Sequence, residues 1–307
     1  MSAATQPFDR RDAVDAAAVA FMILLTFSWG LNGVAAKLAN VGYNPIFLSV
    51  ARSAIACVLV FAWCRYRGIA LFQKDGTLWG GIAAGLLFGS EFTLIFVGLE
   101  YTTVARSSLL VNTMPFWILV GAHFMLGERM SVQKFLGLAL AFGGVVLIFS
   151  DKPSIPGPEA LTGDLLSLGA GLLWALTTLV IKGTKLSTAA PEKVLLYQLV
   201  VSAIMAIPLV PLAGPAIRNA TPLATSALLF QAVYVVAFTY ILWFWLVRRY
   251  PAAGLSSFAF LSPAFSVICG WLLLGEPLTW KIFAALGLIA AGLIIVNRPA
   301  RKQAPAA

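Results

Sequence analysis

The sequence has little charge and almost none of the side chains that bind metals. Only 11% of its 307 residues are Asp, Glu, Lys or Arg, whereas a soluble domain carries about 25%. It contains one histidine and three cysteines, Cys57, Cys64 and Cys269, with no C-x-x-C pair. Neither a zinc site nor a disulfide framework can be built from this set. We therefore expect no metal, no cofactor and no cytosolic enzyme.

Apolar residues are abundant instead. They make up 60% of the chain, and the mean hydropathy is +0.91. The net charge of +9 comes from cations that stand singly or in pairs between apolar runs, so it does not form a phosphate-binding patch. These features predict a protein of the lipid bilayer with no nucleic-acid partner.

Ten apolar runs are each about long enough to cross a bilayer as a helix. We expect ten transmembrane helices near residues 16–36, 45–64, 78–99, 103–126, 132–149, 163–181, 193–212, 224–247, 252–274 and 278–296. No segment between them is long enough to fold alone. A functional site must therefore lie among the helices.

Lys and Arg are unevenly distributed between the two sides of these spans. With the N-terminus inside, 15 lie on the cytoplasmic side and 5 outside, and Arg52 lies within a span. Because cytoplasmic loops carry the excess of cations, we expect both termini in the cytoplasm. The chain then divides into a cytoplasmic segment (1–15), a five-helix unit (16–149), a periplasmic linker (150–162), a second five-helix unit (163–296) and a cytoplasmic tail (297–307).

The two five-helix units resemble each other. Pro115 precedes Gly127-Glu128 by twelve residues, and Pro263 precedes Gly275-Glu276 by the same number. An odd number of spans per unit puts the second unit in the membrane upside down. Inverted repeats can exchange outward-open and inward-open states around one central site, so we expect an all-α membrane transporter with a central cavity.

This pattern resembles the drug/metabolite transporter superfamily, in its EamA-type branch. The resemblance rests on ten spans as five plus five, on the paired Pro…Gly-Glu motifs, on Trp29-Gly30 with Lys37, and on Arg52 in span 2. The chain is also similar to the YddG-type exporters of aromatic amino acids. The resemblance implies a cavity between spans 1–4 and 6–9, with spans 5 and 10 at the edge.

Arg52 and Glu91 are charges within predicted spans, where an unpaired charge costs at least a few kcal/mol. Their predicted depths match. Either they form an ion pair that joins spans 2 and 3, or Arg52 binds a substrate carboxylate, or Glu91 carries a proton. The repeat-equivalent positions are the neutral Gln198 and Thr239.

Further polar and aromatic residues lie within the predicted spans. Either they pack the helices together or they line a pocket for an amino acid, and we favour the pocket. The candidates are Trp29, Asn32, Asn112, Trp174, Thr177, Tyr197, Gln198, Tyr240 and Trp243. Pro115 and Pro263 are either static kinks or hinges.

We therefore expect an exporter of small metabolites in the bacterial inner membrane, working by alternating access, with amino acids as substrates and aromatic ones favoured. The alternative is a proton-coupled exporter of cationic drugs, in which Glu91 binds proton and drug in turn. An intramembrane enzyme would need a nucleophile with a base or a metal cluster, and a channel would need a filter or a ring of charge. Proton coupling and oligomeric state remain open.

Overall fold

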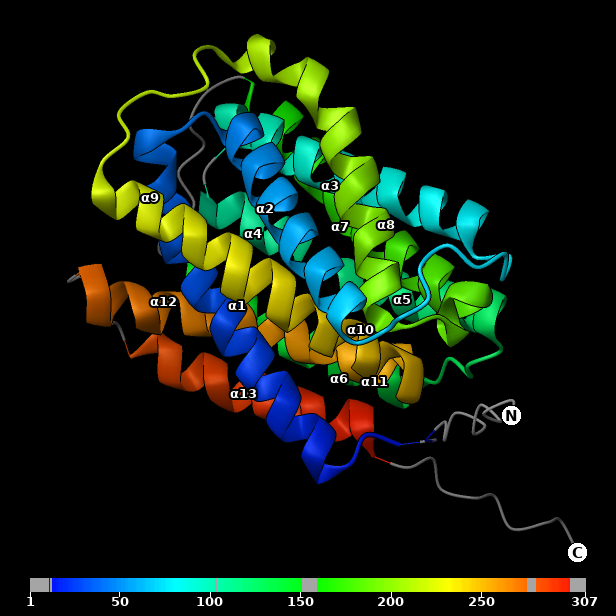
Figure 1. The fold of residues 1–307 in the computed structure, drawn as a ribbon. Helices are drawn as coiled ribbons and strands as arrows, with labels where there is room; N and C mark the ends of the chain where they lie inside the picture. Colours follow the sequence, from blue (N-terminus) through cyan, green and yellow to red (C-terminus); the bar gives the residue numbers. More distant parts are fainter. Residues whose placement is uncertain (1–10, 12, 103, 151–158, 275–279, 299–307) are drawn as a thin grey trace, which may run out of the picture.

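The computed structural model describes residues 11, 13–102, 104–150, 159–274 and 280–298. Within them every regular element is a helix (Figure 1). The first five spans are α1 (Ala16–Gly42), α2 (Pro45–Tyr66), α3 (Leu78–Tyr101), α4 (Val104–Val111) with α5 (Met114–Leu126) as span 4, and α6 (Val132–Phe149) as span 5. Spans 6 and 7 are α7 (Ala160–Gly183) and α8 (Pro191–Ala206) with η2 (Ile207–Ala213). Span 8 is α9 (Pro222–Leu229) with η3 (Phe230–Thr239) and α10 (Tyr240–Arg249), span 9 is α11 (Ala252–Ser257) with η4 (Phe258–Phe260) and α12 (Leu261–Leu274), and span 10 is α13 (Lys281–Asn297).

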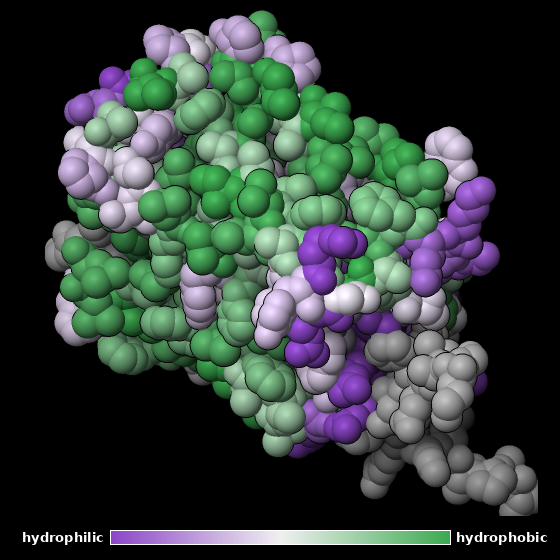
Figure 2. Space-filling model, viewed as in Figure 1, coloured by the Kyte–Doolittle hydropathy of each residue, from purple (hydrophilic) through white to green (hydrophobic). Residues whose placement is uncertain are grey.

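The prediction of an all-helical membrane protein is confirmed. Eight of the described spans are long and apolar enough to cross a bilayer, and α6 and α13 are shorter apolar helices. Their outer surface is apolar across the middle of the molecule, with hydrophilic residues gathered toward its margins (Figure 2). Val58 and Phe238 on this surface are 68% and 54% exposed, as expected of side chains that face lipid.

Local sequence signals explain where several helices begin. The side chain of Asn44 accepts hydrogen bonds from the backbone N–H groups of Ile46 and Phe47, and Pro45 occupies the first turn of α2. Pro191 takes the same position in α8. Proline suits this position because the first N–H groups of a helix have no partner within the helix.

The two repeat-related proline spans are interrupted at equivalent places. In the first, α4 ends at Val111 and α5 begins at Met114, immediately before Pro115. In the second, a short 3-10 segment separates α11 from α12, and Pro263 lies in the first turn of α12. Each proline therefore belongs to the start of a new helical segment and not to the middle of a continuous helix, because it cannot donate the hydrogen bond that would continue one.

The helices pack in pairs that repeat across the two halves. Span 1 packs against spans 8 and 9, and its equivalent, span 6, packs against spans 3 and 4. Spans 5 and 10 pack against each other at α6 and α13. There a methyl group added to Gly144 would lie 2.8 Å from the Ala285 carbonyl oxygen, and one added to Gly292 would lie 2.5 Å from that of Gly137. These contacts are equivalent at the offset of 148 residues, as two similar units related by an axis require.

Both described chain ends lie at one end of the bundle (Figure 1). The Arg11 N–H donates to the Arg249 carbonyl oxygen at 2.8 Å. A methyl group at Gly254 would lie 2.8 Å from Asn297 Oδ1 and 3.1 Å from the Val14 side chain. We call this the termini end. The even number of spans accounts for it; that this end faces the cytoplasm stays a prediction.

Candidate functional site

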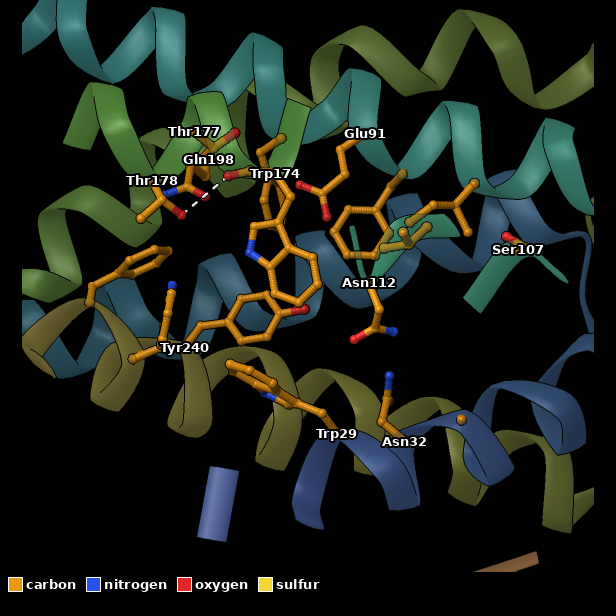
Figure 3. A pocket seen from close by; sticks show the side chains of 17 residues that line it. Trp29, Asn32, Glu91, Ser107, Asn112, Trp174, Thr177, Thr178, Gln198 and Tyr240 are labelled. Atoms are coloured by element: carbon orange, nitrogen blue, oxygen red, sulfur yellow. Dashed lines mark hydrogen bonds between the residues drawn. The ribbon is translucent and has the colours of Figure 1, made fainter. Parts of the chain in front are cut away.

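A cavity of about 290 Å³ lies halfway along the helices. Six spans contribute to its wall (Figure 3). Its lining consists of Trp29, Asn32 and Gly33 from α1, Phe88, Glu91, Phe92 and Ile95 from α3, Ser107, Val111 and Asn112 from span 4, Trp174, Thr177 and Thr178 from α7, Gln198 from α8, and Tyr240, Trp243 and Phe244 from α10. The structure thus brings together nine of the eleven predicted binding residues.

The aromatic part of the wall centres on Trp29. Its ring makes edge-to-face contacts with Trp174, Trp243 and Tyr240, at centroid separations of 6.1, 5.7 and 6.4 Å. Its indole N–H donates to Thr239 Oγ1 at 3.1 Å. Trp29 and Trp174 are repeat equivalents, because Trp29 precedes Lys37 by eight residues and Trp174 precedes Lys182 by the same number. Two equivalent residues can touch only close to the axis that relates the repeats, so the cavity lies on that axis.

The polar part of the wall presents hydrogen-bond acceptors. Three buried oxygens, Glu91 Oε2, Gln198 Oε1 and Asn32 Oδ1, have no hydrogen-bond partner among the described residues. Glu91 is 5% exposed and Gln198 is fully buried. In Figure 3 the Glu91 carboxylate points toward the aromatic rings of the cavity. Burying a polar atom without a partner costs about 1–3 kcal/mol, so a hydrogen-bond donor that reached these oxygens would remove this cost.

Arg52 does not line the cavity. It is 3% exposed, and its guanidinium carbon lies 4.0 Å from the centroid of the Phe92 ring, which does line it. Arg52 interacts electrostatically with Glu91 and Tyr240. The matched depths of Arg52 and Glu91 were therefore a sound signal of proximity, but this arrangement puts the carboxylate at the cavity surface and the guanidinium behind a ring.

Tyr197 is the second predicted residue that the structure does not bring to the cavity. Its hydroxyl lies 3.2 Å from Thr77 Oγ1, and its ring lies where a methyl group on Gly81 would approach within 2.4 Å. On α8 the cavity meets Gln198, whereas Tyr197 packs against α3 at Gly81. Tyr197 therefore lies outside the lining of this cavity, and its role in binding stays a prediction.

Several lining residues were not predicted, although the sequence contained a signal for them. Together with Glu91, the residues Phe88, Phe92 and Ile95 occupy positions i, i+3, i+4 and i+7, which is the spacing of one helix face. The same i, i+3, i+4 spacing joins Tyr240 and Trp243 to the unpredicted Phe244. No comparable pattern in the sequence predicts that η3, directly before Tyr240, is a π-helix.

The termini end below the cavity is held together by a polar cluster. Lys182 Nζ at the end of α7 lies 3.3 Å from Glu128 Oε1, and it donates to the Tyr250 carbonyl oxygen. The same Glu128 oxygen accepts from the backbone N–H of Ala252 at 3.0 Å. Four spans, 4, 6, 8 and 9, are thereby joined at this end. Glu276, the repeat equivalent of Glu128, lies outside the described residues.

Among the described residues there is no group of three or more His, Cys, Asp or Glu side chains that could hold a metal ion. The three cysteines form no disulfide in the structure. The cavity wall itself offers aromatic rings, amides, hydroxyls and one carboxylate.

Known proteins with similar sequences include membrane transporters. The chain is 30% identical over 295 residues to the uncharacterized transporter YvbV of Bacillus subtilis, covering 94% of this chain and 93% of that protein. It is 27% identical over 287 residues to a probable amino-acid metabolite efflux pump of Salmonella typhimurium, covering 89% and 92%. A solved crystal structure superposes with a TM-score of 0.79 at 18% identity, over 91% of this chain and 96% of that one, and so shares its fold.

The profile of the EamA-like transporter family matches residues 16–150 and again residues 161–298. The two matches cover both halves of the chain. Together with the repeated packing and the central cavity, they establish that this multi-pass membrane protein belongs to the EamA-like transporter family.

Proposed function

We propose that this protein exports amino acids with apolar or aromatic side chains across the bacterial inner membrane by alternating access. The observation that carries the proposal is the cavity at the repeat axis, whose wall combines aromatic rings with amide, hydroxyl and carboxylate groups. Such a wall suits a molecule with an apolar side chain and a polar backbone. The similar efflux pump from Salmonella supports the substrate class.

Two features of the described residues support alternating access. Both repeat units contribute residues to the cavity, and the cluster of Glu128 and Lys182 joins four spans at the termini end. We propose that this end is cytoplasmic, as the distribution of Lys and Arg indicates. We propose further that the helix interruptions before Pro115 and Pro263 are the bend points. They occur at equivalent places in spans 4 and 9, which contact each other through α5 and α11.

The proposal is tested by counterflow in proteoliposomes. Vesicles loaded with unlabelled L-phenylalanine, L-leucine or L-aspartate should accumulate the matching labelled amino acid, the first two well and aspartate poorly. Trp174→Ala should reduce counterflow at least about tenfold, since it removes a large ring from the cavity. Trp280→Ala is the matched control, because Trp280 is 70% exposed and does not line the cavity. No counterflow of any amino acid would refute the proposal.

A second function is favoured by one observation. Glu91 Oε2 is buried at the cavity with no partner among the described residues, and such a carboxylate could bind a proton and a cationic drug in turn. Export of cationic dyes that depends on a pH gradient and is abolished in Glu91→Gln, without export of amino acids, would favour this function over the first.

A further inference from the structure

We infer that the cavity contains a binding site for a protonated amine, with the Glu91 carboxylate as its counter-charge. The inference deepens the proposed function and rests on it for the transport step only. The shared chemistry is a primary ammonium group carried on a small apolar or aromatic body. It could be the α-ammonium group of an amino acid or the ammonium group of an amine without a carboxylate.

The first argument is the character of the unsatisfied atoms. Three side-chain atoms of cavity-lining residues are buried without a partner among the described residues, and all three are oxygens: one of a carboxylate and two of amides. The Gln198 side-chain nitrogen donates to the Val194 carbonyl oxygen at 3.5 Å, which supports the assignment of the other amide atom as the oxygen. An ammonium group brings three donors and no acceptor, so it complements this surface. A carboxylate placed against the same oxygens would be repelled.

The second argument is the position of the charges. Glu91 lines the cavity, whereas its electrostatic partner Arg52 does not. The Phe92 ring, 4.0 Å from the guanidinium carbon, lines the cavity where Arg52 does not. Because charge interactions weaken with distance and strengthen where water is excluded, a ligand in the cavity meets the negative member of the pair first.

The third argument is the aromatic wall. Trp29, Trp174, Tyr240 and Trp243 line the same cavity as Glu91. The faces of tryptophan and tyrosine rings attract cations by about 0.5–2 kcal/mol each, depending on solvation. Two of these rings, Trp29 and Trp243, pack edge to face at 5.7 Å, which holds them in place before a ligand binds. Rings beside a carboxylate favour an organic cation over a bare metal ion.

The volume limits the size of the ligand. A cavity of about 150 Å³ accommodates benzene, and this one measures about 290 Å³. One ring with a short chain and an ammonium group therefore fits, while a large multi-ring cationic dye does not fit in this conformation. The structure thus favours a small amine-bearing metabolite.

The test uses four ligands that share a phenyl ring and differ in charge. Quenching of tryptophan fluorescence in the purified protein would measure binding of L-phenylalanine, phenethylamine, 3-phenylpropionate and N-acetyl-L-phenylalanine. We expect the first two to bind and the last two, which lack an ammonium group, to bind at least about tenfold more weakly. This series needs no variant, so a folding defect cannot obscure it.

Variants then assign the counter-charge. Glu91→Gln should weaken binding of phenethylamine at least about tenfold, since it removes a charged acceptor and keeps its shape. Glu159→Gln is the matched control, because that carboxylate is exposed and its side chain does not cap α7. Unchanged binding in Glu91→Gln, equal binding of 3-phenylpropionate and phenethylamine, or no binding of any of the four would overturn the inference.

The two proposals fail separately. Binding of phenethylamine without export of L-phenylalanine would refute amino-acid export and leave the amine site intact. Equal export of L-phenylalanine and 3-phenylpropionate would leave an exporter without the inferred site. If both L-phenylalanine and phenethylamine bind, the ammonium group is sufficient; if only L-phenylalanine binds, the site also needs the carboxylate, and the source of the amine is an amino acid.

Discussion

Neutralising Lys182 should open the termini end of the cavity. Lys182 and Glu128 have side chains only 12% and 17% exposed, with 3.3 Å between Nζ and Oε1. The Glu128 oxygen also accepts from the Ala252 N–H, at the start of α11. Lys182→Met keeps the length of the side chain and removes its charge. It eliminates the contact that connects α7 with Glu128 and with the Tyr250 carbonyl oxygen.

The expected magnitude follows from these contacts. A largely buried, charge-assisted hydrogen bond contributes about 1.5–3 kcal/mol. If the bond exists only when this end is closed, losing about 2 kcal/mol shifts the equilibrium between closed and open by about 30-fold. The shift should favour the state in which water reaches the cavity from the termini end.

Cysteine labelling measures this shift directly. In a chain with Cys57, Cys64 and Cys269 replaced by alanine, Thr177→Cys places one thiol on the cavity wall. A membrane-impermeant thiol reagent, added on the termini side, should label it about 30-fold faster when Lys182→Met is present. Lys134→Met is the matched control, since Lys134 at the same end contacts the Arg129 carbonyl oxygen and not Glu128.

Glu128→Gln should accelerate labelling in the same direction. The double variant should show little further effect, because both changes remove one interaction. An unchanged labelling rate in Lys182→Met, or an equal increase in the Lys134 control, would refute the reasoning that this cluster closes the end of the cavity.

Three further predictions concern packing, charge and bending. Gly85→Ala should lower the melting temperature, because its methyl group would lie 2.5 Å from Val201 Cβ and 2.9 Å from the Tyr197 carbonyl oxygen. We expect this overpacking to cost about 1–3 kcal/mol of stability. Gly143→Ala is the control and should leave the melting temperature unchanged, since its methyl group would have no atom beyond its own stretch of helix within 4 Å. Hydrogen bonds from Lys193 and Thr77 lower the pKa of Asp75 to about 2, so its stabilising contribution is complete above the ordinary value of about 3.9 and is lost as the pH falls through about 2. Asp75→Asn should therefore reduce thermal stability at pH 6, with a difference from the parent that shrinks between pH 4 and pH 2; a constant difference would argue against this pair. Pro115→Ala and Pro263→Ala should each slow counterflow if the interruptions bend during transport, and full activity in both variants would exclude a hinge.

Much of the architecture could be predicted from the sequence because the bilayer restricts what a chain can do. Runs of about 20 apolar residues have to become helices, since backbone N–H and C=O groups in lipid need partners within the same segment. Gly81, Gly85 and Gly89 stand four residues apart, a spacing that lets helices approach closely, and the structure has α8 there, with Tyr197, Val201 and Met205 against the three glycines. The resemblance between the two five-helix units is matched by packing that repeats in the two halves.

The direction in which a side chain points was harder to predict. Tyr197 and Gln198 are neighbours in sequence, yet only Gln198 lines the cavity, because packing against the other helices sets how α8 is rotated about its axis. Glu91 and Arg52 were matched in depth from the sequence. The Phe92 ring that separates Arg52 from the cavity could not be anticipated, since depth along a helix does not determine rotation about its axis.

Composition and periodicity alone therefore determined that this chain is a helical membrane protein of two similar halves, because hydrophobicity and segment length act locally along the chain. Only the tertiary structure decided that the rings of Trp29 and Trp174 meet on the repeat axis, that three buried oxygens of cavity-lining residues lack partners among the described residues, and that Glu128 and Lys182 join spans at one end of the bundle. These depend on how helices far apart in sequence are rotated and packed against one another, which no local pattern specifies.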